Sequence, residues 1–166
     1  MLDCWDAFAF DSLPSLVQSC YNLPSENWSV TTLSKDIKLN DDGGCFVCGQ
    51  SNPIGLKLEF TQEDDEYITY FTPQKEHQGY EGITHGGIVS TVMDEVMARY
   101  THILGYSTVT GEITVRLKHP ARIGHKLRFS GCILSEEGRV INCSAEATDE
   151  DGEIVATATA KMVKVG

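Results

Sequence analysis

The sequence predicts an α+β domain in which an antiparallel β-sheet of about six strands wraps around one long central helix. Three observations lead to this prediction. One stretch, residues 86–104, has its apolar residues at helical spacing. The stretches on either side alternate apolar and polar residues, as half-buried strands do. The turns that join them are short, so neighbouring strands are expected to form antiparallel hairpins.

The helix is expected to run from Gly86 to Leu104 and to stop at Gly105, because glycine commonly follows a helix C-terminus. Apolar residues recur along it at steps of four, four, four and three. The residues expected to face the core are Ile88, Val92, Val96, Tyr100 and Ile103. A second face is small and polar, and consists of Gly87, Ser90, Thr91, Asp94 and Ala98.

Two strands are predicted before the helix and four after it. The first two, residues 56–60 and 67–71, form a hairpin through the acidic turn 63–66. The later strands are expected at residues 107–119, 126–135, 139–148 and 153–165. Cys132 and Cys143 are then expected to lie nearly opposite each other, as two packed thiols.

The chain has 166 residues, enough for one compact domain and an appendage. Residues 45–166 are expected to form the domain. Residues 1–44 mix apolar patches with proline, serine and asparagine, and are expected to form an N-terminal extension that is partly helical or irregular.

The formal net charge of −11 and the pI near 4.7 argue against nucleic acid and anionic membranes as partners, since both attract basic surfaces. The first ten residues contain no lysine or arginine, unlike a secretory signal, and no run approaches the ~20 apolar residues of a membrane helix. We therefore expect a cytoplasmic protein. Its six cysteines are too scattered for a disulfide scaffold and are expected to be reduced.

The segment His85-Gly86-Gly87 stands at the expected start of the helix. Glycines there let a ligand approach backbone N–H groups that have no partner within the helix. The helix dipole adds partial positive charge at this point, which suits an oxyanion or a phosphate. Acyl transfer needs donors of this kind. The alternative is that the two glycines only allow close packing.

Asp94 is the candidate acid. It follows Gly87 by seven residues, so the two lie on nearly the same face. They are nevertheless about 10 Å apart along the helix axis, too far for both to touch one carbonyl group. If both act, a second chain must supply its Asp94, which predicts an obligate dimer with two composite sites. A solvated helix charge is the alternative for Asp94 and the favoured interpretation for Glu95, about 100° around the helix.

The string from His77 to Asp94, HQGYEGITHGGIVSTVMD, resembles the signature of the phenylacetyl-CoA-thioesterase-like branch of the hotdog-fold thioesterase superfamily. In that branch HGG opens the central helix and an acid follows nine residues after the histidine. Residues 45–49 and 52–56 also look like the opening of that domain. The resemblance covers most of residues 45–165. It implies a hotdog fold, hydrolysis of acyl-CoA, no cofactor, and a dimer or a dimer of dimers.

The resemblance also implies roles for four catalytic residues. Gly86 would donate its N–H to the oxyanion, and Asp94 would act as general base or nucleophile. His85 would help to hold the loop. Thr110 matches a strand threonine that assists the acid in carboxyl-terminal-modulator-like thioesterases, although threonine is also an ordinary strand residue.

Gly87 and Gln78 are expected to contact the substrate. One position departs from the pattern, because many relatives carry asparagine or glutamine six residues before the HGG histidine, where this chain has Gly79. Gln78 and His77 are the candidates to replace that side chain.

Five of the 13 basic residues lie between Ile113 and Ser135, a stretch without Asp or Glu. They are Arg116, Lys118, Arg122, Lys126 and Arg128. We expect this cationic zone, and especially Arg116, Lys118 and Arg122, to bind the phosphates of coenzyme A. A solvated strand surface is the alternative for each residue.

Two other functions are open at this point. A hydratase or dehydratase acting on acyl thioesters needs a histidine paired with an acid, and His77 is the candidate. A non-catalytic module that binds acyl-CoA is the other.

The pair Cys45 and Cys48 has the spacing of half a zinc site or of a redox pair. Because no second CxxC and no paired histidine accompany it, no metal is expected.

Overall fold

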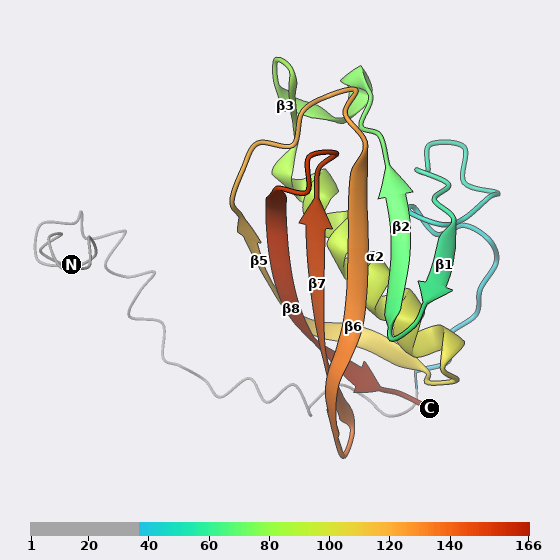
Figure 1. Ribbon diagram of the computed structural model, residues 1–166. Helices are drawn as coiled ribbons and strands as arrows, with labels where there is room; N and C mark the ends of the chain where they lie inside the picture. Colours follow the sequence, from blue (N-terminus) through green and yellow to red (C-terminus); the bar gives the residue numbers. More distant parts are fainter. Residues whose placement is uncertain (1–36) are drawn as a thin grey trace, which may run out of the picture.

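The computed structural model describes residues 37–166. In this part of the chain, six antiparallel strands form one sheet in the order β1-β2-β6-β7-β8-β5, and one long helix, α2, lies against it (Figure 1). The predicted α+β arrangement is confirmed. Most of the predicted N-terminal extension lies outside the described residues, and residues 37–44 contain neither helix nor strand. In the described part, no helix is both long and apolar enough to cross a bilayer.

The elements follow the predicted order. Helix α2 spans Gly86–Ile103. The strands of the sheet are β1 (Phe60–Glu63), β2 (Glu66–Phe71), β5 (Thr108–Leu117), β6 (Leu127–Glu137), β7 (Val140–Thr148) and β8 (Ile154–Lys164). A short 3-10 helix (Lys75–His77) leads into a separate small hairpin of β3 (Gln78–Tyr80) and β4 (Ile83–Thr84).

The first strand begins four residues later than predicted. Lys57 has a φ of 54°, which interrupts the extended backbone of residues 56–60. Leu56 and Leu58 donate their N–H groups to the carbonyls of Phe46 and Val47 instead of continuing the hairpin with β2. The apolar alternation of residues 56–58 therefore belongs to a loop that packs beside the helix.

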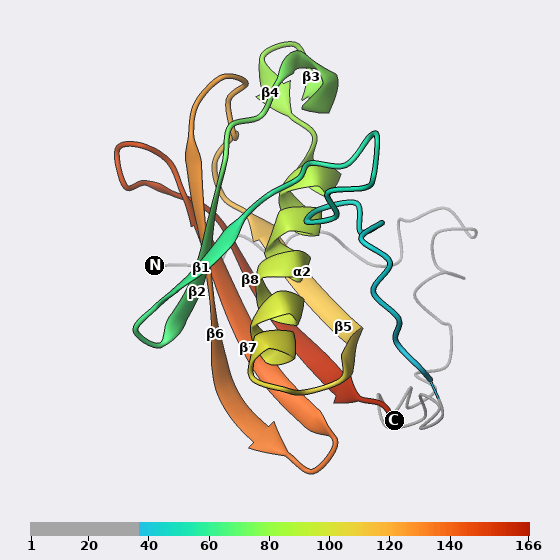
Figure 2. The ribbon, with the colours of Figure 1, turned by 90° about the vertical axis from the view of Figure 1, so that its right-hand side faces the viewer.

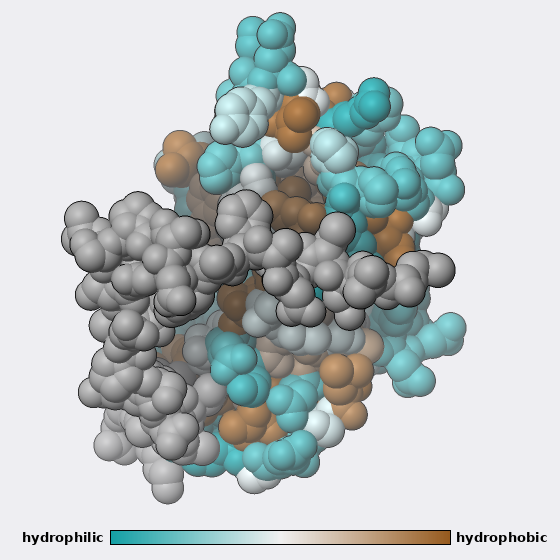
Figure 3. All heavy atoms as spheres, turned by 90° about the vertical axis from the view of Figure 1, so that its left-hand side faces the viewer, coloured by the Kyte–Doolittle hydropathy of each residue, from teal (hydrophilic) through white to brown (hydrophobic). Residues whose placement is uncertain are grey.

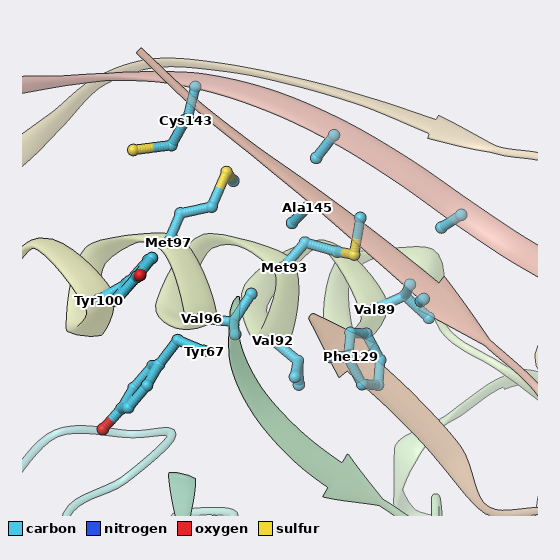
Figure 4. Close-up of a cluster of buried hydrophobic side chains, with 14 of the residues drawn as sticks. Tyr67, Val89, Val92, Met93, Val96, Met97, Tyr100, Phe129, Cys143 and Ala145 are labelled. Atoms are coloured by element: carbon cyan, nitrogen blue, oxygen red, sulfur yellow. The ribbon is translucent and has the colours of Figure 1, made fainter. Parts of the chain in front are cut away.

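The buried face of α2 is wider than the predicted stripe, because the sheet curves around the helix and contacts it from several strands (Figure 2). Ile103 is 41% exposed at the end of the helix, and Ile88 is only partly buried. Figure 4 shows side chains of this face between the helix and the strands. The residues of α2 that are buried are Val89, Val92, Met93, Val96, Met97, Tyr100 and Thr101.

Small residues on the sheet allow the helix to lie close to it. A side chain at Gly131 of β6 would place its Cβ 3.2 Å from Val96 Cγ1 and 3.3 Å from the Val96 carbonyl oxygen. Buried alanines line the neighbouring strands β7 and β8: Ala145, Ala147, Ala156, Ala158 and Ala160. The position of α2 is thus set by backbone contact as well as by side-chain packing.

The predicted neighbours Cys132 and Cys143 are on opposite faces of the sheet. Cys132 pairs with Ser144, and Cys143 pairs with Ile133, so the register differs by one residue from the predicted one. Cys143 is buried in the core, whereas Cys132 contacts the Ser144 hydroxyl at 3.1 Å. The two thiols do not pack together.

Replacing Gly131 with valine should push α2 away from β6 and lower the free energy of unfolding by about 1–3 kcal/mol, the usual cost of overpacking. Denaturant unfolding measures this change. As a control on the same strand, Leu134→Val alters a side chain that is 61% exposed and should have an effect within about 0.5 kcal/mol. Equal effects of the two substitutions would contradict the close approach at Gly131.

Candidate active site

The N-terminus of α2 leaves one backbone donor free. His85 is the N-cap, and its Nδ1 accepts the N–H of Gly87 at 2.9 Å. Its carbonyl accepts the N–H groups of Ile88 and Val89 at 2.9 and 3.3 Å. The Gly86 N–H has no acceptor among residues 37–166. Of the two glycines, Gly86 therefore presents the available donor, at the positive end of the helix dipole.

The loop before the helix holds His85 in place. The His85 N–H donates to the carbonyl of His77 at 2.8 Å, and the Thr84 N–H donates to the carbonyl of Ala121 at 2.8 Å. A Cβ at Gly79 would lie 3.2 Å from His85 Cα and Cδ2. The larger residue that many relatives carry at this position would therefore press on His85 here. Gln78 is exposed and pairs with Thr84 in the small hairpin.

Gly86 lines a cavity of about 350 Å³. The lining is mostly apolar and includes Val89 of the helix and Leu117 at the end of β5. Lys118 also contributes to it. Thr84, which the sequence pattern did not single out, lines the same cavity, and its Oγ1 is buried without a hydrogen-bond partner in the described chain. A buried hydroxyl without a partner is unusual, and it lies beside the cavity at Gly86.

Asp94 lies in the middle of α2 and is hydrogen-bonded to β5. Thr110 donates its hydroxyl to Asp94 Oδ1 at 2.8 Å. The register of β5 against β8 shifts between Thr110 and Glu112, which is a bulge at Gly111. Burial raises the pKa of the Asp94 carboxyl above its usual value, and the Thr110 hydrogen bond opposes that rise. The structure thus brings together the two residues that were predicted to act as a pair.

Gly86 and Asp94 are not brought together within one chain. Eight residues of helix separate them by about 12 Å along the axis. Asp94 is not among the residues that line the cavity at Gly86. Within one chain, the Gly86 N–H and the Asp94 carboxylate therefore lie at two separate places.

Glu95 is not a solvated helix charge, contrary to the favoured interpretation. It is half-buried, and both of its carboxylate oxygens lie 3.5 Å from Cys45 Sγ. The contact joins residues that are 50 positions apart in the sequence, so helix periodicity alone gives no indication of it.

The basic residues of the predicted cationic zone have different surroundings. Arg128 pairs with Glu66 at 2.8 Å, and Lys126 lies 4.2 Å from the centre of the Tyr70 ring. Arg122 faces acidic residues in a second cavity of about 440 Å³, which Asp149, Asp151 and Glu153 also line. Arg116 and Lys118 are exposed near the end of β5, and Lys118 is the one that reaches the cavity at Gly86.

Comparison with solved structures identifies the fold as the hotdog fold. A thioesterase superfamily protein, RHA08564, superimposes with a TM-score of 0.70 at 18% identity, over 92% of this chain and 80% of that one. The PaaI protein of the E. coli phenylacetic acid degradation operon superimposes with a TM-score of 0.63 at 16% identity, over 67% and 81%. The protein smu.793 of Streptococcus mutans, solved with acetyl-CoA, has a TM-score of 0.62 at 20% identity, over 66% and 89%.

Part of the sequence is similar to known thioesterases. Residues 81–156, which include α2 and most of the later strands, match the family model of the thioesterase superfamily. The acyl-coenzyme A thioesterase THEM4 of Xenopus laevis is 25% identical over 107 residues, which is 64% of this chain. The match covers 48% of that relative, so the chain spans about half of its length.

Replacing Asp94 with asparagine should stabilise the fold near neutral pH. Because burial raises the pKa of Asp94 in the folded chain, the folded state binds this proton more tightly than the unfolded state does. Above that raised pKa, the ionised carboxylate lowers stability, and Asp94→Asn removes this loss while keeping an acceptor for Thr110. Thermal unfolding at a series of pH values should show a higher Tm for the variant near neutral pH.

The difference in Tm should shrink as the pH falls and the wild-type carboxyl becomes protonated. Asp151→Asn, in an exposed turn, is the control and should change the Tm little. A variant less stable than the wild type at neutral pH would show that burial does not penalise the Asp94 carboxylate.

Proposed function

We propose that the chain hydrolyses the thioester of an acyl-CoA to the free acid and coenzyme A. One observation carries the proposal: a single helix presents a free N–H at its N-terminus, at Gly86, and a half-buried carboxylate, Asp94, held by Thr110. The match to the thioesterase superfamily and the likeness to an acyl-coenzyme A thioesterase support this activity. Hotdog-fold neighbours solved with acetyl-CoA and coenzyme A support the substrate class.

The Gly86 N–H stabilises the negative charge that develops on the thioester oxygen. The donor lies where the helix dipole adds positive charge, and it has no competing acceptor in the described chain. The apolar lining of the adjacent cavity suits the hydrocarbon part of the substrate, and Lys118 at the same cavity suits a phosphate of coenzyme A.

The Asp94 carboxylate drives the attack on the thioester carbon. As a base, it takes a proton from a water molecule whose oxygen forms the new C–O bond. As a nucleophile, it forms a mixed anhydride that water then hydrolyses. In both routes the C–S bond breaks and the sulfur of coenzyme A leaves with a proton. Both routes require an ionised Asp94.

The separation of about 12 Å between Gly86 and Asp94 leads us to propose that a second copy of the chain completes each site. Strand β5 is an edge of the sheet in the described part of the chain, and Ile113 and Leu117 on it are 36% and 54% exposed. Figure 3 shows hydrophobic residues on the surface at the β5 side of the molecule. Exposed apolar residues on an edge strand of this kind favour pairing with another chain.

The hydratase alternative has less support. It requires a histidine beside the acid, and His77 was the candidate. In the structure His77 Nδ1 accepts the N–H of Gln74 at 2.9 Å, and its ring packs 5.1 Å from the ring of Phe71.

Gly86→Pro tests the donor while keeping the helix. Proline lacks an N–H and suits the first position of a helix. The preceding residue, His85, has φ of −61° and ψ of 129°, an extended conformation that is compatible with a following proline. The variant should release thiol from acyl-CoA about 10²–10³-fold more slowly than the wild type. Gly86→Ala is the matched control. It adds the same Cβ, 2.6 Å from the flexible end of Leu117, but keeps the N–H, and should retain most of the activity.

Equal losses in the proline and alanine variants would mean that space, not the N–H, matters at this position.

Asp94→Asn should lose about 10²–10⁴-fold in the same assay. Unchanged turnover by Asp94→Asn across short, long and aromatic acyl-CoAs would exclude the proposed reaction.

Mixing two inactive variants tests the composite site. A mixed dimer of Asp94→Asn and Gly86→Pro chains has one site with an intact Gly86 from one chain and an intact Asp94 from the other. Random mixing in equal amounts should therefore restore about a quarter of the wild-type activity. Sites contained within single chains would stay inactive after mixing.

A further inference from the structure

Three side chains with metal-binding atoms meet beside α2. Cys45 and Cys48 come from the loop before β1, and Glu95 comes from the helix. Their sulfur and oxygen atoms all lie within 4.8 Å of one another. The loop runs alongside α2 in Figure 2. The cluster, here called the Cys45–Cys48–Glu95 cluster, lies on a different side of the helix from Asp94, about 100° away.

The spacing within the cluster fits a tetrahedral zinc ion. Zinc binds cysteine sulfur at about 2.3 Å and carboxylate oxygen at about 2.1 Å, so at a tetrahedral angle the two ligand atoms are about 3.6 Å apart. Cys45 Sγ lies 3.5 Å from each carboxylate oxygen of Glu95. The sulfur of Cys48 lies within 4.8 Å of the other two ligand atoms.

The backbone around the two cysteines is built tightly. The Val47 N–H donates to Cys45 Sγ at 3.4 Å. The Gly49 N–H donates to the carbonyl of Cys45 at 2.9 Å. A Cβ at Gly49 would lie 2.4 Å from the Gly43 carbonyl oxygen and 2.5 Å from that of Cys45, so this turn requires glycine. The backbone of the turn that carries both cysteines is therefore closely constrained.

The carboxylate in the cluster lacks a balancing cation in the described chain. None of the ion pairs within residues 37–166 includes Glu95. Arg99 lies one turn further along α2, but its Nε is buried without a hydrogen-bond partner in this part of the chain. A half-buried carboxylate beside two thiols is costly without a positive charge, and a divalent ion supplies that charge.

We propose that Cys45, Cys48 and Glu95 bind one Zn²⁺ ion. Two thiolates favour zinc over magnesium or calcium, which prefer oxygen ligands. The two thiol protons leave to solvent as the Zn–S bonds form. Three protein ligands leave the fourth tetrahedral position for water. The ion joins the loop to the central helix, and the proposal does not depend on thioester hydrolysis.

Metal content of the full chain tests the proposal. The reduced, metal-free protein is incubated with zinc chloride, passed through a desalting column and measured by plasma mass spectrometry. We expect about one zinc ion per chain. Cys45→Ser and Cys48→Ser should abolish retention, and Glu95→Gln should weaken binding by more than about 10-fold in a chelator competition. With Co²⁺ in place of zinc, the thiolate absorption band should appear in the wild type and be lost in Cys48→Ser.

Matched controls use the other cysteines. Cys132→Ser alters a thiol on the outer face of the sheet and should retain zinc. The double variant Cys4→Ser and Cys20→Ser should also retain it, which separates the cluster from thiols outside the described residues. The proposal is overturned if Cys48→Ser retains as much zinc as the wild type. It is also overturned if the reduced chain takes up no zinc and thiol counting before reduction shows a Cys45–Cys48 disulfide instead.

Discussion

The close packing of α2 into the curved sheet is the constraint on which the rest of the structure depends. Gly131 and the rows of buried alanines let the helix backbone come within contact distance of the strands. Because the helix cannot shift without a clash, its two ends and its sides are fixed in space. A free N–H at Gly86, an acid at Asp94 and a carboxylate at Glu95 are thereby held at set positions on one rigid element.

Two adjacent residues on this helix have different environments. Asp94 faces β5, where Thr110 donates a hydrogen bond to it. Glu95 faces the loop before β1, where the Cys45 thiol contacts it. Each carboxylate is half-buried, so each depends on a partner from a separate part of the chain. The helix thus connects a candidate catalytic acid with a candidate metal ligand without their sharing a contact.

Much of this could be predicted from the sequence, because it depends on local periodicity. The helix limits, the order of the main strands along the chain and the placement of Gly86 at the helix start follow from spacing alone. The pairing of Thr110 with Asp94 follows from resemblance. The contact of Glu95 with Cys45 and the buried hydroxyl of Thr84 could not be predicted, since both depend on how distant segments meet. The ion pair of Arg128 with Glu66 could not be predicted for a related reason, because only the folded sheet brings β2 and β6 together.

The bulge at Gly111 divides β5 into two parts with different surroundings. Before it, Thr108 to Thr110 are half-buried, and Thr108 and Thr110 contact the helix through Thr101 and Asp94. After it, most of the strand is exposed. Because the extra residue absorbs the change of register, the outer part can vary in sequence or exchange its neighbours without moving the hydroxyl at Thr110. The outer part of β5 can therefore change its surface, and with it the molecules it contacts, while the inner part keeps Thr110 in place beside Asp94.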